Sequence, residues 1–263
     1  MRFLLILFFL TSSIFAREVS TRYDVHVTMF GHVGYADFTL RENGDKYEAK
    51  LVAKTINIAA TLLKNRVETF TSRGKIINGV YTPSVFIKTK DTTKRKRIQT
   101  YSFNQENKEV MLVEEKTKTV NKTRFDAKRF KFVTREVEEK SRKEEVLETF
   151  IGNDTLSAYL NSKHGCSLKE KNHTLFAIGA HNDKNNVSYR CLEGKTKETM
   201  LLNFSNGVQD VYNLHVEPLD KDDTVVDALI GYDSDGFLKE GLLDEIFWIG
   251  KIVAVRVNHQ ISN

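Results

Sequence analysis

The sequence predicts a mainly β chain with short helices, which opens as an antiparallel meander. Apolar and polar residues alternate over several runs, which is the period of half-buried strands. Asn-Gly pairs stand between such runs, where tight hairpins form. Only two stretches, Thr55–Asn65 and Asn153–Leu160, have helical features instead.

The first strands are the clearest. Tyr23–Met29 alternates in strict order, and Tyr35–Arg41 and Lys46–Lys54 do the same on either side of Glu42–Asp45. Asn43-Gly44 predicts a two-residue type I′ turn, because that turn needs positive φ at both central residues.

Apolar residues in Thr55–Asn65 can share one face of a short amphipathic helix or helical turn. Strands are expected to resume after it, and Pro83 fits only an edge or a bend. The expected order is strand Arg66–Ser72, a turn at Arg73-Gly74, strand Lys75–Ile77, a turn at Asn78-Gly79 and a strand from Val80.

Lys88–Leu147 is the most charged stretch. It predicts two strands around a turn near Asn104–Lys108 and a third strand at Phe130–Val133. The basic run Lys94–Arg97 suits phosphate or anionic lipid headgroups. Acidic neighbours such as Glu114 favour the simpler interpretation, a solvated strand face whose charges prevent edge-to-edge association.

Asn153–Leu160 begins like a capped helix, because Asn and Asp satisfy free amides at a helix start. Glu136–Glu148 is the one plausible seam in residues 17–263, which we expect to form a single domain. Later strands are expected near Thr174–Ile178, Val187–Cys191, Met200–Phe204, Tyr212–Val216, Ile246–Ile249 and Ile252–Val257.

Met1–Ala16 has the pattern of a signal peptide that is cleaved after Ala16. Arg2 precedes the apolar run Phe3–Leu10, and small or apolar residues precede Arg17 at the cleavage positions. About 14 uncharged residues are fewer than the roughly 20 that span a bilayer, which disfavours an uncut anchor. We therefore expect an exported chain that does not span a membrane after cleavage.

Composition argues against nucleic acid as a partner. The 40 Lys and Arg residues, of which cleavage removes only Arg2, nearly balance 35 Asp and Glu residues. Nucleic-acid-binding proteins usually concentrate basic residues on one face.

Cys166 and Cys191 are the only cysteines. An isolated pair in an oxidising compartment favours a disulfide, which would close a loop of about 25 residues and contribute on the order of 3 kcal/mol. Free thiols and a metal site that includes His164 are the alternatives. No further clustered ligands support the metal site.

No catalytic, cofactor or metal motif is found, so we expect a protein that is not an enzyme. Acidic turns near Asp220–Asp223 and Tyr232–Gly236 lack the spacing of a calcium loop. Among five Asn-x-Ser/Thr sequons, Asn172 alone has an acidic residue two places earlier. That context resembles the extended sequon of bacterial glycosylation.

The aromatic content has two interpretations. There are 17 Phe, nine Tyr and one Trp. They can form a β core, or they can line a ligand cavity that a curved sheet leaves open. The residues expected in such a cavity are Phe38, Phe70, Phe86, Tyr101, Phe103 and Trp248.

The stretches Tyr23–Thr28, Gly44–Ala53 and Ser72–Pro83 resemble a bacterial envelope family called domain of unknown function 3108. Asp154–Leu160 and Phe247–Arg256 are similar to its later features, although Gly250–Ala254 replaces its usual acidic turn and proline. The resemblance implies a strongly curved antiparallel sheet, an incomplete barrel with a helical plug, like LolA/LolB-type lipoprotein carriers. It implies no catalytic residues.

With this resemblance, the expected location is the bacterial periplasm. The leading functional hypothesis is a protein that holds a lipid, another hydrophobic ligand or a lipidated partner in its half-barrel, with Thr55–Asn65 as a lid. The alternative is an envelope scaffold that binds another protein without a small ligand. An enzyme is the third hypothesis.

Overall fold

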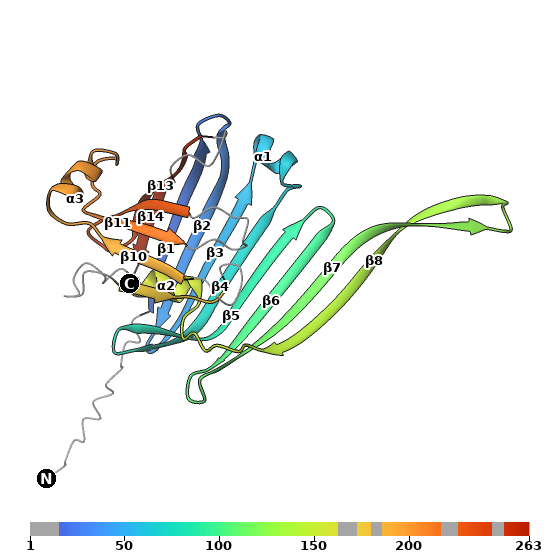
Figure 1. Cartoon of the computed structure of the whole chain (residues 1–263), viewed down its shortest axis with the longest axis horizontal. Helices are drawn as coiled ribbons and strands as arrows, with labels where there is room; N and C mark the ends of the chain where they lie inside the picture. The colour runs from blue at the N-terminus through green and yellow to red at the C-terminus, as the bar shows by residue number, and fades with distance from the viewer. Residues whose placement is uncertain (1–15, 163–172, 180–185, 217–225, 244–249, 263) are drawn as a thin grey trace, which may run out of the picture.

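The computed structural model describes residues 16–162, 173–179, 186–216, 226–243 and 250–262. These ranges form one antiparallel sheet of fourteen strands, with three short helices (Figure 1). The strands are β1 (Ala16–Val27), β2 (Gly31–Asn43), β3 (Lys46–Thr55), β4 (Val67–Ile77), β5 (Val80–Thr92), β6 (Arg95–Asn104), β7 (Glu109–Asp126), β8 (Lys131–Val146), β9 (His173–Phe176), β10 (Asn186–Cys191), β11 (Asp210–Val216), β12 (Val226–Tyr232), β13 (Leu238–Leu243) and β14 (Ile252–Ser262). The helices are α1 (Asn57–Leu62), α2 (Thr155–Ser162) and α3 (Gly194–Leu201).

Strand β1 lies in the middle of the sheet. The order runs from β8 down to β1, then from β14 down to β9, so the first and last described strands pair with each other. Strands β8 and β9 are at the two ends, and no pairing joins them in the described part of the chain. The predicted mainly β fold and incomplete barrel are therefore confirmed.

Helix α2 packs against the sheet and lies beside β10 (Figure 1). It contacts β3, β4, β5 and β9, and Leu156 and Leu160 are buried against the sheet. The Asn161 side-chain amide holds the backbone of Tyr81 with two hydrogen bonds of 2.9 and 3.0 Å. The predicted helix start is confirmed, because Asp154 Oδ1 accepts the amides of Leu156 and Ser157 at 2.7 and 2.9 Å.

Two predicted turns are present, with one change of type. Asn43 pairs with Lys46, and within their turn Gly44 alone has positive φ, +59°. This is the pattern of a type II′ turn and not the predicted type I′. Asn78 and Gly79 both have positive φ, 51° and 81°, which is the type I′ pattern.

The predicted turn at Arg73-Gly74 is wrong. Strand β4 continues through both residues, with a bulge between them opposite Pro83. The bulge is where a proline is tolerated inside a sheet. It also brings the backbone of β5 so close that a Cβ on Gly74 would lie 2.0 Å from the Thr82 carbonyl oxygen.

The second half differs more from the predictions. Met200–Phe204 is not a strand, because α3 ends at Leu201 and a turn follows. Strands β12 and β13 were not predicted, whereas strands near the other predicted positions are present as β9, β10, β11 and β14. The predicted strand Ile246–Ile249 lies outside the described residues. Within the described ranges, no helix has the length and apolar character needed to cross a membrane.

Candidate functional site

The aromatic residues predicted to line a cavity lie mainly in the core. Phe38, Phe86, Tyr101 and Phe103 are buried, and Phe70 is partly buried against them. The Phe86 ring lies 5.8 Å from that of Tyr101, and Phe38 meets Tyr159 of α2 edge-on at 5.6 Å. Trp248 lies outside the described residues. Ligand contact by these residues stays a prediction.

An apolar groove opens instead between α1 and the neighbouring ends of β1, β2 and β3. Its volume is about 470 Å³. The helix contributes Ile58, Ala59, Leu62 and Leu63. The large apolar side chains from the rest of the wall are Val25, Val27, Phe30, Val33 and Ile252.

Small residues of β2 and β3 form the floor of this groove and leave its space open. Gly34, Ala36 and Ala53 line it, and Ala36 pairs directly with Ala53 across β2 and β3. A side chain at Gly34 has no room, because its Cβ would lie 2.7 Å from the Lys54 carbonyl oxygen. The close approach of two strands therefore requires glycine at this position.

Helix α1 covers the groove without being buried in it. No residue of α1 is buried, and Ile58, Leu62 and Leu63 are exposed. The helix is held at its start, where the Ile56 amide and the Asn57 side chain donate to the carbonyls of Val33 and His32, each at 2.9 Å. Apolar side chains at the groove are therefore open to solvent.

A basic hollow lies beside the groove, at the turn between β5 and β6. Its volume is about 1100 Å³. The end of α1 and the residues after it join the two features, since Leu62 and Leu63 line the groove whereas Lys64 and Asn65 line the hollow. The hollow's basic residues are Lys64, Lys90, Lys94, Arg95, Lys96, Arg97, Lys116 and Lys118.

Positive charge is only partly neutralised in the basic hollow. Glu114 forms ion pairs with Arg97 and Lys116, but no acidic residue is among the residues lining the hollow. Burial would raise the pKa of Glu114, yet its bonds to Lys116 and Arg97 hold that pKa below its usual value. The remaining cations favour a negatively charged partner.

Lys88 adds a half-buried cation on β5. Its Nζ donates to the Gly179 carbonyl at 3.1 Å and lies 5.6 Å from the centre of the Phe70 ring. Burial lowers the pKa of Lys88, and the nearby cations Arg97, Lys90 and Arg66 lower it further against the opposing effect of Glu68.

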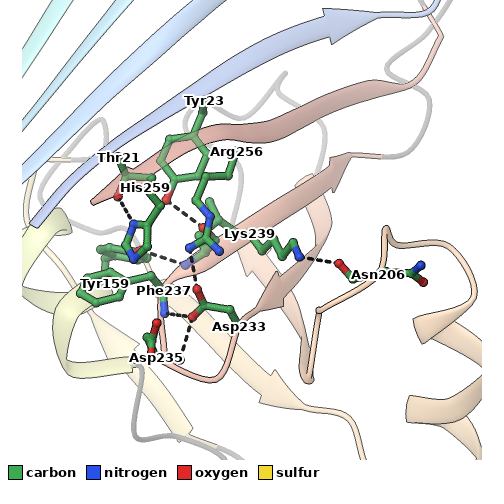
Figure 2. Close-up of polar contacts among 11 residues, drawn as sticks. Thr21, Tyr23, Tyr159, Asn206, Asp233, Asp235, Phe237, Lys239, Arg256 and His259 are labelled. Atoms are coloured by element: carbon green, nitrogen blue, oxygen red, sulfur yellow. Dashed lines mark hydrogen bonds and ion pairs between the residues drawn. The ribbon is translucent and has the colours of Figure 1, made fainter. Parts of the chain in front are cut away.

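A polar cluster ties the last strand to the β12–β13 turn (Figure 2). Arg256 of β14 forms an ion pair with Asp233 at 2.6 Å, and Asp233 Oδ1 accepts the amides of Asp235 and Phe237, each at 3.0 Å. Desolvation would raise the pKa of Asp233, but the Phe237 amide and Arg256 outweigh it and hold that pKa below its usual value.

Two groups among the described residues bring three potential metal-ligand atoms together. Asp233, Asp235 and His259 form one of them, but the guanidinium of Arg256 already pairs with Asp233 and opposes a cation there. The other is Asp24, His26 and His32 at the β1–β2 turn, where the two imidazoles stack 4.8 Å apart. Sequence reasoning missed both groups because each depends on strand pairing.

Several sequence predictions fall outside the described residues. Met1–Phe15 of the signal peptide, Cys166 and Asn172 are all there. The cleavage site, the Cys166–Cys191 disulfide and glycosylation at Asn172 therefore stay predictions.

Comparisons with known proteins found a matching family model and a similar solved structure. A family model described as protein of unknown function (DUF3108) matches residues 22–129, which include Ser72–Pro83 but not the later stretches with family resemblance. A crystal structure of a β-barrel-like protein of domain of unknown function DUF1849 from Brucella abortus has a TM-score of 0.45 and 11% identity, and the alignment covers 94% of this chain and 98% of that one. None of the curated proteins matches this sequence.

Proposed function

We propose that this chain is a non-enzymatic, exported protein that holds the apolar part of a lipid or another hydrophobic ligand in the groove beneath α1. The observation that carries the proposal is an open apolar groove of about 470 Å³ under a helix that exposes its own apolar residues. Ligand sites in proteins are typically roughly 300–1,000 Å³ and mostly apolar.

Burial of an alkyl chain supplies enough free energy for binding. Each methylene moved out of water contributes about 0.8 kcal/mol, so even a few of them stabilise a complex measurably. No catalytic group is needed for this function. The likeness to LolA/LolB-type carriers that the sequence suggests belongs to this proposal.

Export is compatible with the position of the first strand. Strand β1 begins at Ala16, and Arg17 pairs with Glu42 in β2. Cleavage after Ala16 would therefore remove only the first residue of β1, and the central strand would remain. A periplasmic location follows from the same proposal.

The basic hollow specifies which ligands should bind best. It adjoins the groove through Leu63 and Lys64, so a ligand whose chain lies in the groove can place its polar end in the hollow. Cations without acidic partners stabilise an anionic end. A long-chain fatty acid should therefore bind more tightly than the alcohol of the same chain length.

Native mass spectrometry after gentle purification, followed by titration with a fluorescent fatty acid, tests the proposal. Ala53→Phe places a ring on the groove floor and should weaken binding roughly tenfold or more, because overpacking displaces the ligand. Val80→Phe is the matched control, since it adds the same ring at an exposed position at the other end of β4 and β5. A wild-type protein that carries no ligand and binds neither fatty acid nor phospholipid would refute the proposal and favour an interaction scaffold.

A further inference from the structure

The β7–β8 ribbon extends well beyond the rest of the sheet (Figure 1). Strand β6 begins at Arg95, which pairs with Lys118, and the Thr119 amide donates to the Lys94 carbonyl at 2.9 Å. From Val120 onward β7 pairs with β8 alone. The projecting part of β7 ends at Asp126 and is roughly 23 Å long at about 3.3 Å per residue. Strand β8 is exposed along nearly all its length, and the buried residues of β7 lie in its first part, so the projecting part of the ribbon contributes little to the core.

Three phenylalanines gather at the tip of this ribbon. Phe125 and Phe132 form a cross-strand pair, and the Phe125 ring meets Phe130 and Phe132 edge-on at 5.5 and 5.3 Å. Their exposed fractions are 49% for Phe125, 86% for Phe130 and 74% for Phe132. Large apolar side chains exposed together at one place mark a contact surface.

The turn at the tip is built around Asp126. Its Oδ1 accepts the amides of Lys128 and Arg129 at 3.0 and 3.3 Å, so two amides of the turn are satisfied internally. Phe130 has a φ of +53°, a conformation in which glycine or asparagine is normally found. An aromatic residue kept at a strained position suggests that the exposed ring has a function.

Positive charge surrounds the aromatic tip. Lys122–Arg135 contains six Lys and Arg residues and Asp126 as its single acidic residue. Asp126 lies 4.0 Å from Arg129, and Lys122 pairs with Glu139. In the described structure, no ion pair within 4.0 Å involves the other four cations, Arg124, Lys128, Lys131 and Arg135.

We propose that the tip of the β7–β8 ribbon docks on an anionic lipid bilayer, with Phe125, Phe130 and Phe132 inserted at the interface and the surrounding cations bound to acidic headgroups. Apolar aromatic residues next to Lys and Arg are the composition of segments that lie about 5–10 Å deep in the headgroup region. A slender tip offers little of the roughly 800 Å² per partner that stable protein interfaces bury, which favours the bilayer over a protein partner.

The test is co-sedimentation of the full chain with vesicles of phosphatidylglycerol and phosphatidylcholine in equal parts, compared with vesicles of phosphatidylcholine alone. Wild-type protein should bind the mixed vesicles more strongly, and added salt should reduce the difference. Phe130→Gly with Phe132→Thr should lower the partition coefficient about tenfold or more. Leu202→Thr is the matched control, because Leu202 has the same exposed fraction as Phe130, 86%, and lies after α3.

The charge contribution has its own pair of variants. Lys128→Gln with Lys131→Gln should reduce the preference for phosphatidylglycerol. Lys75→Gln with Lys108→Gln removes the same charge from exposed positions near other turns and should leave the preference unchanged.

Folding and function are separated by two further measurements. Phe130→Gly relieves the positive φ, so the thermal unfolding midpoint of the tip variants should not fall. Groove variant Ala53→Phe should bind vesicles like wild type. Failure of wild-type protein to bind phosphatidylglycerol vesicles, or equal binding by the tip variants, overturns the proposal and leaves a protein partner as the occupant of the tip.

Discussion

Asp154 is a buried carboxylate that joins α2 to the sheet. Its Oδ1 caps the helix, and its Oδ2 accepts a hydrogen bond of 2.6 Å from Ser72 Oγ in β4. Because Ser72 Oγ donates to Asp154, it accepts from the Tyr47 hydroxyl at 2.9 Å. Burial raises the pKa of Asp154, and the bonds from Ser72, Ser157 and Leu156 counteract this rise.

Asp154→Ala should lower the free energy of unfolding by about 2–4 kcal/mol, because it removes a helix cap and leaves a buried hydroxyl without its acceptor. Asp154→Asn keeps an oxygen for the cap and should cost less. Urea unfolding of wild type, Asp154→Asn and Asp154→Ala measures whether the free energy of unfolding falls in that order. Equal midpoints for Asp154→Ala and wild type would show that the cap contributes nothing.

The cap was predictable from the sequence, whereas its partner was not. Asn153-Asp154 before an apolar stretch is a local signal, and the helix starts there. Ser72 is far away in the sequence and reaches Asp154 only through the pairing of β3, β4 and β5.

The candidate site was hard to predict for the same reason, because its residues come together only through the pairing of strands. The described aromatic residues of the predicted set lie in or against the core, which is the β-core interpretation of the aromatic content, and their contact with a ligand stays a prediction. The groove is lined instead by small residues such as Gly34 and Ala53, which no pattern in the sequence marked.

Helix α1 shows how an element can serve binding more than stability. Ile58→Gln with Leu62→Gln changes two exposed side chains, so the free energy of unfolding should shift by only about 0.5 kcal/mol per site. Fatty-acid affinity should fall several-fold, because both residues line the groove. A fluorescence titration beside a urea curve measures both effects. Unchanged affinity would remove α1 from the site.

Local pattern identified many elements but not their full lengths. The alternation and turn residues of β1 to β5 are local signals, and these strands form near their predicted places. Strands β7 and β8 have 18 and 16 residues, although alternating apolar residues mark only parts of them. Ion pairs between the two strands, such as that of Lys122 with Glu139, and opposite charges at paired positions, such as Lys118 and Glu139, continue the ribbon where few apolar residues signal a strand.

The whole sheet depends on a pairing that local sequence does not encode, that of β1 with β14. Thr21 and His259 are joined across it by a hydrogen bond of 2.7 Å between Oγ1 and Nδ1. Arg256, on the same last strand, is ion-paired to Asp233 beyond the end of β12. The described N-terminal and C-terminal strands are therefore held together at the centre of the molecule, where loss of pairing would separate two halves of the sheet (Figure 2).

The protonation of His259 and Asp233 should make this arrangement weaker in acid. Burial and then Arg256 lower the pKa of His259, and Asp233 also has a lowered pKa. Both groups bind protons more readily in the unfolded chain, where the pKa of a histidine is about 6.5 and that of an aspartate is about 3.9. The full contribution of each group to the free energy of unfolding is therefore present above its unfolded pKa. Each contribution is lost as the pH falls through the lower pKa of the folded state. The free energy of unfolding should therefore decrease from near neutral pH toward pH about 4 as His259 is protonated, and it should decrease further below pH about 4 as Asp233 is protonated.

Urea unfolding between pH about 8 and pH about 4, with His259→Gln for comparison, isolates the imidazole's part of this dependence. The variant lacks the titrating group, so wild type should lose more stability than the variant between pH about 6.5 and pH about 5. An equal loss in the two proteins would assign the acid sensitivity to other groups. A greater loss in the variant would mean that protonated His259 stabilises the fold, which the guanidinium of Arg256 and the burial of the ring oppose.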